Sequence, residues 1–102
     1  LRAPRLQRLF MADCQALLAR LKEAVAQVDH AEAARIAHSL KGSAGQFGEA
    51  ALEASAALME QAAADADIAT MVAALLQLDM QGLTLAARQP GPSEKTGKPD
   101  DV

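Results

Sequence analysis

The sequence contains no tryptophan and no tyrosine, and it has only two phenylalanines among its 102 residues. Proteins that bind single-stranded nucleic acids stack the bases on aromatic side chains, and no run of basic residues offers an alternative here. The formal net charge of −3 is also unfavourable for contact with a phosphate backbone. We therefore expect no nucleic-acid partner.

Cysteine is nearly absent as well. The single Cys14 cannot form an internal disulfide, which fits a reducing compartment, and it falls at an apolar position of the first expected helix. The two histidines, His30 and His38, are eight residues apart, and neither an H-x-x-x-H nor a C-x-x-C pair occurs. We therefore expect no metal site.

Long uninterrupted apolar runs are also lacking, because charged residues break the longest ones. We expect no membrane-spanning segment and no direct membrane contact. The N-terminal LRAPRLQRLFMADC lacks the apolar run of a signal peptide. These features favour a cytoplasmic protein.

Alanine and leucine dominate the 51% of residues that are apolar, whereas β-branched residues are few. This composition favours a single all-α domain with an aliphatic core. Pro4 is suited to the first turn of a long first helix. The apolar residues that follow recur every three or four positions and predict one buried stripe: Leu6, Phe10, Cys14, Leu17, Leu21, Val25 and Val28.

Signals for the ends of helices follow this stripe. Asp29 is a suitable N-cap for a second helix, and Glu32 three positions later completes a variant of the capping box. Gly48 is well placed to end that helix. A third helix is expected over residues 49–64 and a fourth from Ile68, which Asp67 can cap. Their inner stripes comprise Leu52, Ala56 and Met59, then Ile68, Met71, Val72, Leu75, Leu78, Gly82 and Leu85.

Short connections between helices of similar length predict antiparallel neighbours. The expected fold is an antiparallel up-down four-helix bundle with a long first helix, formed by residues 1–88. The composition changes after Arg88, because QPGPSEKTGKPDDV contains three prolines and two glycines and is almost free of apolar side chains. We expect residues 89–102 to be a disordered tail or linker.

Residues 37–48, AHSLKGSAGQFG, place three glycines beside a histidine and a lysine in an otherwise helix-forming sequence. On a wheel of about 100° per residue, Ile36 and Leu40 mark the core face, and His38 points roughly 150° away from its centre. The neighbours of His38 within two turns are small or basic and leave the imidazole open to a large partner. They include Ala34, Arg35, Lys41, Gly42 and Gly45.

An exposed imidazole with a lysine one turn away suits transfer of a phosphoryl group through the histidine. Neutral imidazole is a nucleophile near neutral pH, and an ammonium group can hold phosphoryl oxygens in transit. The order of residues in KGSAG differs from that of a nucleotide-binding P-loop, and no strand precedes it. Ser39 and Cys14 lack the base and orienting acid of a nucleophilic triad.

With these residues the stretch resembles the motif of histidine-containing phosphotransfer (HPt) domains, H-x-L-K-G-S/G-x-x-x-x-G. The matching positions are His38, Leu40, Lys41, Gly42, Ser43 and Gly48. The GSAGQFG variant is also similar to the phosphotransfer domain of chemotaxis histidine kinases. The resemblance covers residues 5 to 88, although only the motif is specific.

The resemblance implies a set of site residues. His38 would be phosphorylated on Nε2, Lys41 would steady the phosphoryl group, and Gly42 would permit close approach of a receiver domain. The family position that orients the histidine through Nδ1 corresponds to Glu60, with Gln61 as the neighbouring candidate. Ala34, Arg35 and Gly45 share the face of His38 and extend the predicted docking surface, and Gln46 is a further candidate near it.

The implied function is that of a phosphorelay intermediate in two-component signalling. His38 would accept a phosphoryl group from a receiver-domain aspartate, or from a histidine kinase catalytic domain, and pass it to another receiver. The domain itself would bind no cofactor, and Mg²⁺ is expected in the receiver. It would have no kinase activity of its own. The alternative is a non-catalytic helical interaction module of a sensor kinase. The polar tail and the lack of an initiator methionine favour a cytoplasmic module of a larger sensor kinase, such as a membrane-bound one.

Overall fold

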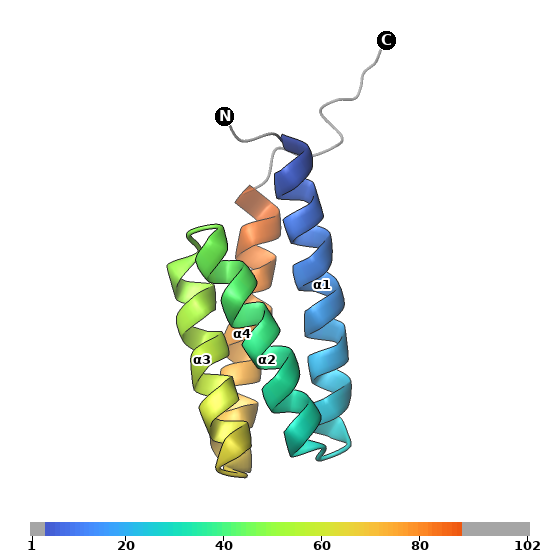
Figure 1. The fold of residues 1–102 in the computed structure, drawn as a ribbon, viewed down its shortest axis with the longest axis vertical. Helices are drawn as coiled ribbons and strands as arrows, with labels where there is room; N and C mark the ends of the chain where they lie inside the picture. The colour runs from blue at the N-terminus through green and yellow to red at the C-terminus, as the bar shows by residue number, and fades with distance from the viewer. Residues whose placement is uncertain (1–3, 89–102) are drawn as a thin grey trace.

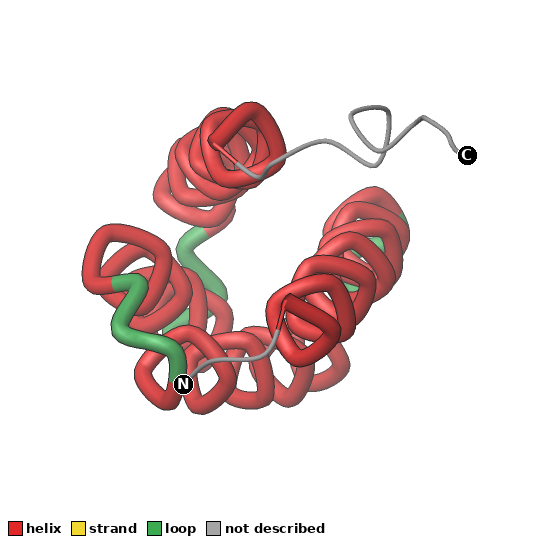
Figure 2. The backbone as a smooth tube through the Cα atoms, turned by 90° about the horizontal axis from the view of Figure 1, so that it is seen from above, coloured by secondary structure: helices red, strands yellow, loops and turns green. Residues whose placement is uncertain are grey.

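The computed structural model describes residues 4–88, which form four helices and no strand. These are α1 (Pro4–Ala26), α2 (His30–Gln46), α3 (Ala50–Ala64) and α4 (Ile68–Arg88). The helices alternate in direction, each packs against its neighbours in the chain, and α4 closes the ring against α1 (Figure 1; Figure 2). The predicted all-α up-down four-helix bundle with a long first helix is confirmed. The predicted tail, residues 89–102, lies outside the described residues.

The core is aliphatic, as the composition predicts. Phe10 of α1 stacks on Phe47 at the end of α2, with ring centroids 4.4 Å apart. Cys14 is buried, and this burial, reinforced by the nearby Asp13 and Glu49 carboxylates, raises the pKa of its thiol to about 11. The largest fully buried side chains are Leu21, Ile36, Leu40, Met59, Met71 and Leu78.

The predicted stripe of α1 is wrong at both ends. Leu6 and Val28 are exposed, and in the middle of the helix Leu18 is buried whereas Leu17 is half-buried. Leu6 is exposed because α1 begins beyond the end of its neighbour α2, so that Phe10 is the first buried residue of α1. Val28 lies past the end of α1, in the turn before α2.

The predicted stripe of α4 is wrong at Ile68 and Val72, which are exposed. The buried residues of α4 are Met71, Ala74, Leu78, Gly82 and Leu85. The apolar residues of α4 cover more than one face, so helical spacing alone fits two stripes. Packing against α1 and α3 buries only one of them.

By length and composition, α4 is apolar enough to cross a membrane, and the expectation that no segment qualifies is therefore wrong. The core helix of a bundle meets the same criterion. In this fold α4 contributes its buried face to the core between α1 and α3.

All three connections between the helices have the same geometry. Val28, Gly48 and Ala66 each adopt a positive φ, of 56°, 71° and 54°. After each of them, the next N–H bonds back to a carbonyl in the last turn of the preceding helix, as Glu49 N does to Ala44 O at 2.9 Å. These are Schellman motifs, which end a helix with one left-handed residue. The prediction that Gly48 ends α2 is confirmed.

The residue after each left-handed position is acidic and begins the next helix. Asp29 Oδ1 accepts a hydrogen bond from Glu32 N at 3.1 Å, and Asp67 Oδ1 accepts one from Thr70 N at 3.2 Å. Both N-caps are as predicted. The reciprocal half of the capping box is not formed, because the Asp29 N–H already donates to Ala24 O and the Glu32 side chain binds Arg35.

Candidate functional site

His38 lies in the middle of α2, on the face opposite the buried residues of that helix. Its side chain is 68% exposed, whereas Ile36, Ala37 and Leu40 on either side are fully buried. The predicted outward orientation of the histidine is confirmed. The imidazole is therefore accessible to a partner without any rearrangement of the bundle.

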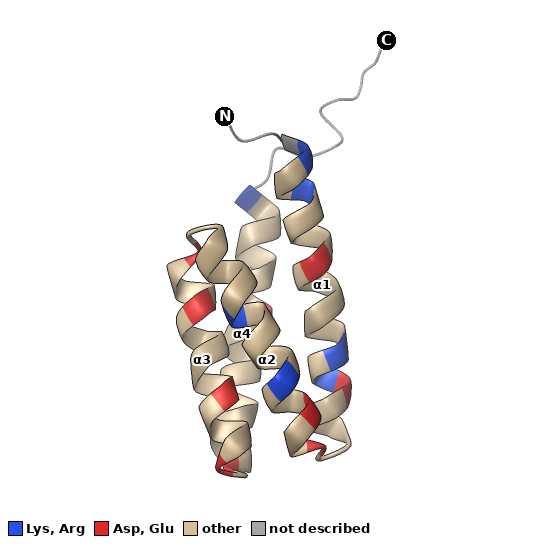
Figure 3. Cartoon of the chain, in the orientation of Figure 1, with Lys and Arg blue, Asp and Glu red and all other residues tan. Residues whose placement is uncertain are grey.

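Glu60 of α3 faces His38 of α2. Its Oε2 lies 3.0 Å from His38 Nδ1, and its Oε1 lies 2.7 Å from Lys41 Nζ. Figure 3 shows the basic positions of α2 and the acidic positions of α3 on the same side of the bundle. One carboxylate thus bridges the histidine and the lysine of the sequence motif.

The ionisation of Glu60 reflects these contacts. The hydrogen bond from Lys41 is the largest influence and lowers the pKa of the Glu60 carboxyl; the bond with His38 acts in the same direction, against partial desolvation. Glu60 is therefore an anion at neutral pH. In the neutral imidazole, Nδ1–H donates to this anion, so the lone pair of the ring is on Nε2. The open nitrogen is the nucleophilic one.

The sequence offered Gln61 as a second candidate for the orienting group. In the structure Gln61 makes another contact: its Nε2 donates to Asp65, the C-cap residue of its own helix, at 3.2 Å. Gln46 is exposed in the last turn of α2, eight residues and about 12 Å along the helix axis from His38. The fold does not bring either glutamine to the imidazole.

Arg35 lies one turn before His38, but its guanidinium is held elsewhere. Its Nε donates to Glu32 Oε1 at 3.1 Å, and the other oxygen of Glu32 lies 3.4 Å from the Arg20 guanidinium on α1. Arg35 therefore belongs to an exposed network that joins α1 and α2. Ala34, the adjacent docking candidate, is half-buried against the core.

The two glycines that follow Lys41 differ in their surroundings. A Cβ added at Gly42 would meet nothing within 4 Å, so this position is open towards solvent. A Cβ at Gly45 would lie 2.9 Å from Oε2 of Glu53 on α3. Gly45 therefore lies beside the end of the flexible, exposed Glu53 side chain, a contact between α2 and α3 that the sequence did not indicate. The only available signal was the seven-residue spacing of Glu53 and Glu60, which places both on one face of α3.

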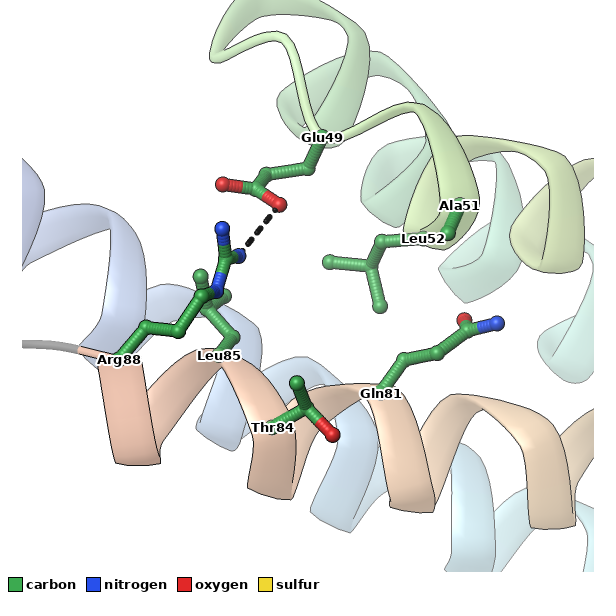
Figure 4. Close-up of a pocket in the computed structure, with 7 residues that line it drawn as sticks. All are labelled: Glu49, Ala51, Leu52, Gln81, Thr84, Leu85 and Arg88. Atoms are coloured by element: carbon green, nitrogen blue, oxygen red, sulfur yellow. Dashed lines mark hydrogen bonds and ion pairs between the residues drawn. The ribbon is translucent and has the colours of Figure 1, made fainter.

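A hollow on the described surface lies at a different seam of the bundle. It has a volume of about 350 Å³ between the start of α3 and the end of α4 (Figure 4). Arg88 Nη2 and Glu49 Oε1 form an ion pair of 2.9 Å at its edge. Glu49 thus faces α4 and is not part of the His38 site. Within residues 4–88, no three His, Cys, Asp or Glu side chains are grouped to hold a metal ion.

Comparison with known protein families identifies the family of the chain. The Hpt domain family matches residues 5–86, which include all four helices almost in full and the His38 motif. The chain belongs to the Hpt domain family. Its role is therefore phosphotransfer in two-component signalling. Neither a curated protein nor a solved structure matches the chain.

Proposed function

We propose that His38 is the phosphoryl acceptor of this domain and that the domain is a phosphorelay intermediate between two receiver domains. The observation that supports this role is the pairing of Nδ1 with the Glu60 carboxylate, which leaves the lone pair of Nε2 on the exposed side of the ring. The Cys14 thiol is not a competing nucleophile, because it is buried and its pKa is raised to about 11.

The transfer step needs only groups that this chain and the receiver supply. Nε2 attacks phosphorus in line, the bond from phosphorus to the aspartate oxygen breaks, and an N–P bond forms. The aspartate leaves as a carboxylate bound to the Mg²⁺ of the receiver. The proton stays on Nδ1, where Glu60 stabilises the positive charge that develops on the ring.

Lys41 supplies the second part of the site. Its ammonium is anchored by Glu60 Oε1 one turn from His38, and it can turn towards the phosphoryl oxygens as they arrive. Gly42 leaves the space beside the imidazole open for a receiver. We place the domain in the cytoplasm, where receivers act, with a histidine kinase catalytic domain as a further possible phosphoryl donor.

The first test uses a small phosphoryl donor, so that no partner has to be guessed. Incubation with phosphoramidate, followed by ³¹P NMR, is expected to give one phosphohistidine that is acid-labile and alkali-stable. His38→Gln should abolish the signal, and His30→Gln should keep it. Phosphorylation of His38→Gln, or none of the wild type, would contradict the proposal.

The relay itself is tested with receiver domains that have been phosphorylated by acetyl phosphate in the presence of Mg²⁺. Wild type is expected to remove the phosphoryl group from at least one receiver and to return it to a second. A domain that gains phosphate from phosphoramidate but only binds receivers, without exchange, would be an interaction module instead.

A further inference from the structure

The outer face of α4 is apolar along its whole length. Its exposed large side chains, Ile68, Val72, Leu76, Met80 and Leu83, form what we call the α4 outer stripe. The last three are the most exposed, at 61%, 68% and 71%. At 100° per residue, the stripe lies roughly 150° from the buried residues of the same helix. It therefore points away from the core.

The one charged residue within the span of this stripe is Asp79, whose side chain is 39% exposed. The exposed residues between its members are Ala69, Ala73 and Gln77. The two charged residues of α4 are both turned to neighbouring elements, since Asp79 pairs with Lys22 of α1 at 2.9 Å and Arg88 pairs with Glu49. A partner that covers the stripe would meet a single ion pair, that of Asp79 with Lys22, at the edge towards α1. Leu83 also lines a groove of about 200 Å³ between α1 and α4, which extends the surface sideways.

The stripe is remote from the phosphotransfer site. In Figure 1 helices α2 and α3 lie nearer the viewer and α4 lies behind them, and the view from above agrees (Figure 2). Helices α2 and α4 are diagonal in the bundle and do not pack against each other. A partner on the stripe would leave His38 open, so phosphotransfer does not account for this surface.

The composition of the stripe and of the chain limits which partner could cover the α4 outer stripe. Helices that lie on membrane surfaces carry Lys and Arg beside their apolar face, whereas α4 has one basic residue in 21 and the chain has a net charge of −3. Residues 89–102 include a single large aliphatic residue, Val102, so this segment does not offer a matching apolar face. A second copy of α4 does offer one.

We propose that two copies of this domain associate through the α4 outer stripe, antiparallel and about a two-fold axis near Leu76. Such an interface is self-complementary: Leu76 meets its copy, and Val72 lies opposite Met80. The five side chains expose roughly 500 Å² in each copy, near the upper limit for a patch on a monomer. Two copies would bury about 1,000 Å², the lower limit for a specific interface.

An interface of this size predicts a weak dimer, with a Kd on the order of 1–100 μM. Sedimentation equilibrium from 5 μM to 1 mM is expected to show a shift from the 10.6 kDa of one chain to twice that mass. Leu76→Glu should weaken association at least 100-fold, because two carboxylates would face each other at the axis. Circular dichroism should show unchanged helix content, since Leu76 is exposed.

The control is Leu9→Glu on α1, the same change at a leucine that is 55% exposed outside the stripe, which should leave the mass unchanged. Oxidation should cross-link Leu76→Cys to its copy far faster than Ala54→Cys on α3. Phosphorylation by phosphoramidate should be the same for wild type and Leu76→Glu. A monomer at 1 mM would overturn the proposal. So would equal dimerisation of Leu76→Glu, or a stripe that instead binds neutral or anionic lipid vesicles.

Discussion

At the residue scale, the site depends on one carboxylate that contacts both polar groups of the motif. Glu60 holds Nδ1 of His38 and Nζ of Lys41 through different oxygens. It is a positioning residue, because it acts on the phosphoryl group only through the imidazole and the lysine. The sequence indicated this position through the family resemblance. It gave Glu60 as the matching position and Gln61 as the neighbouring candidate, and the rotation of α3 against α2 decides which of them meets the histidine.

Substitutions at Glu60 should separate orientation from charge. Glu60→Gln keeps an acceptor for Nδ1–H but loses the charge, and Glu60→Ala loses both. We expect Glu60→Ala to slow phosphorylation of His38 about tenfold or more, and Glu60→Gln to slow it less. The ¹⁵N shifts of the imidazole should show a single tautomer in wild type and a mixture in Glu60→Ala. Equal tautomer populations in both proteins would mean that Glu60 does not orient the ring.

The stability contribution of Glu60 should also depend on pH. Its pKa lies below the ordinary value of 4.5, so the contribution is fully present above about pH 4.5 and is lost as the pH falls through the lowered pKa. Urea unfolding should therefore show Glu60→Gln to be less stable than wild type at pH 7, with the difference shrinking below pH 4. A difference that grows towards acidic pH would contradict this ionisation.

At the scale of helices and turns, the chain repeats the same type of turn three times. Each turn ends a helix with a left-handed residue and starts the next with an acidic one. In the sequence, Gly48 indicates such a turn, and Asp29 and Asp67 indicate where the next helices begin. Val28 and Ala66 give no such signal, because residues with a Cβ disfavour positive φ. Closure of the antiparallel helix pairs imposes the conformation on them.

The strain at these turns can be measured. Val28→Gly is expected to raise the free energy of unfolding by about 1 kcal/mol, because glycine adopts φ of 56° without a steric penalty and the valine side chain is mostly exposed. Gly48→Ala should lower it by about 1 kcal/mol. Urea titrations of both variants measure the sign of each change in the free energy of unfolding. Gln27→Gly next to the turn serves as the control. A destabilised Val28→Gly would show that the side chain of Val28 matters more than its backbone.

At the scale of the whole molecule, packing decides which glycines serve folding and which leave a surface open. A Cβ at Gly82 of α4 would lie 3.0 Å from Leu18 Cδ1 of α1, whereas a Cβ at Gly42 would meet nothing. The sequence assigned Gly82 to the inner stripe of α4 and could not show that α1 approaches it so closely. Gly82 therefore lies where α1 packs tightly against α4.

The same substitution at both glycines should have opposite effects. Gly82→Leu is expected to destabilise the fold by about 1–3 kcal/mol, because it overpacks the contact between α1 and α4. Gly42→Leu should keep or raise stability, by up to about 1 kcal/mol, because leucine is the better helix former. Gly42→Leu should nevertheless slow transfer from a phosphorylated receiver while phosphorylation by phosphoramidate continues. Slowing of both reactions alike would mean that Gly42 does not act through partner access.

The sequence by itself determined the four helices, the caps at Asp29 and Asp67, the stop at Gly48 and the outward histidine of the motif. These features depend on contacts within three or four residues, which the order of residues contains directly. The buried faces of α1 and α4, the partner of His38 and the close packing at Gly82 depend on the tertiary structure. Each of these joins residues that are distant in the chain, and only the rotation and offset of packed helices bring them together.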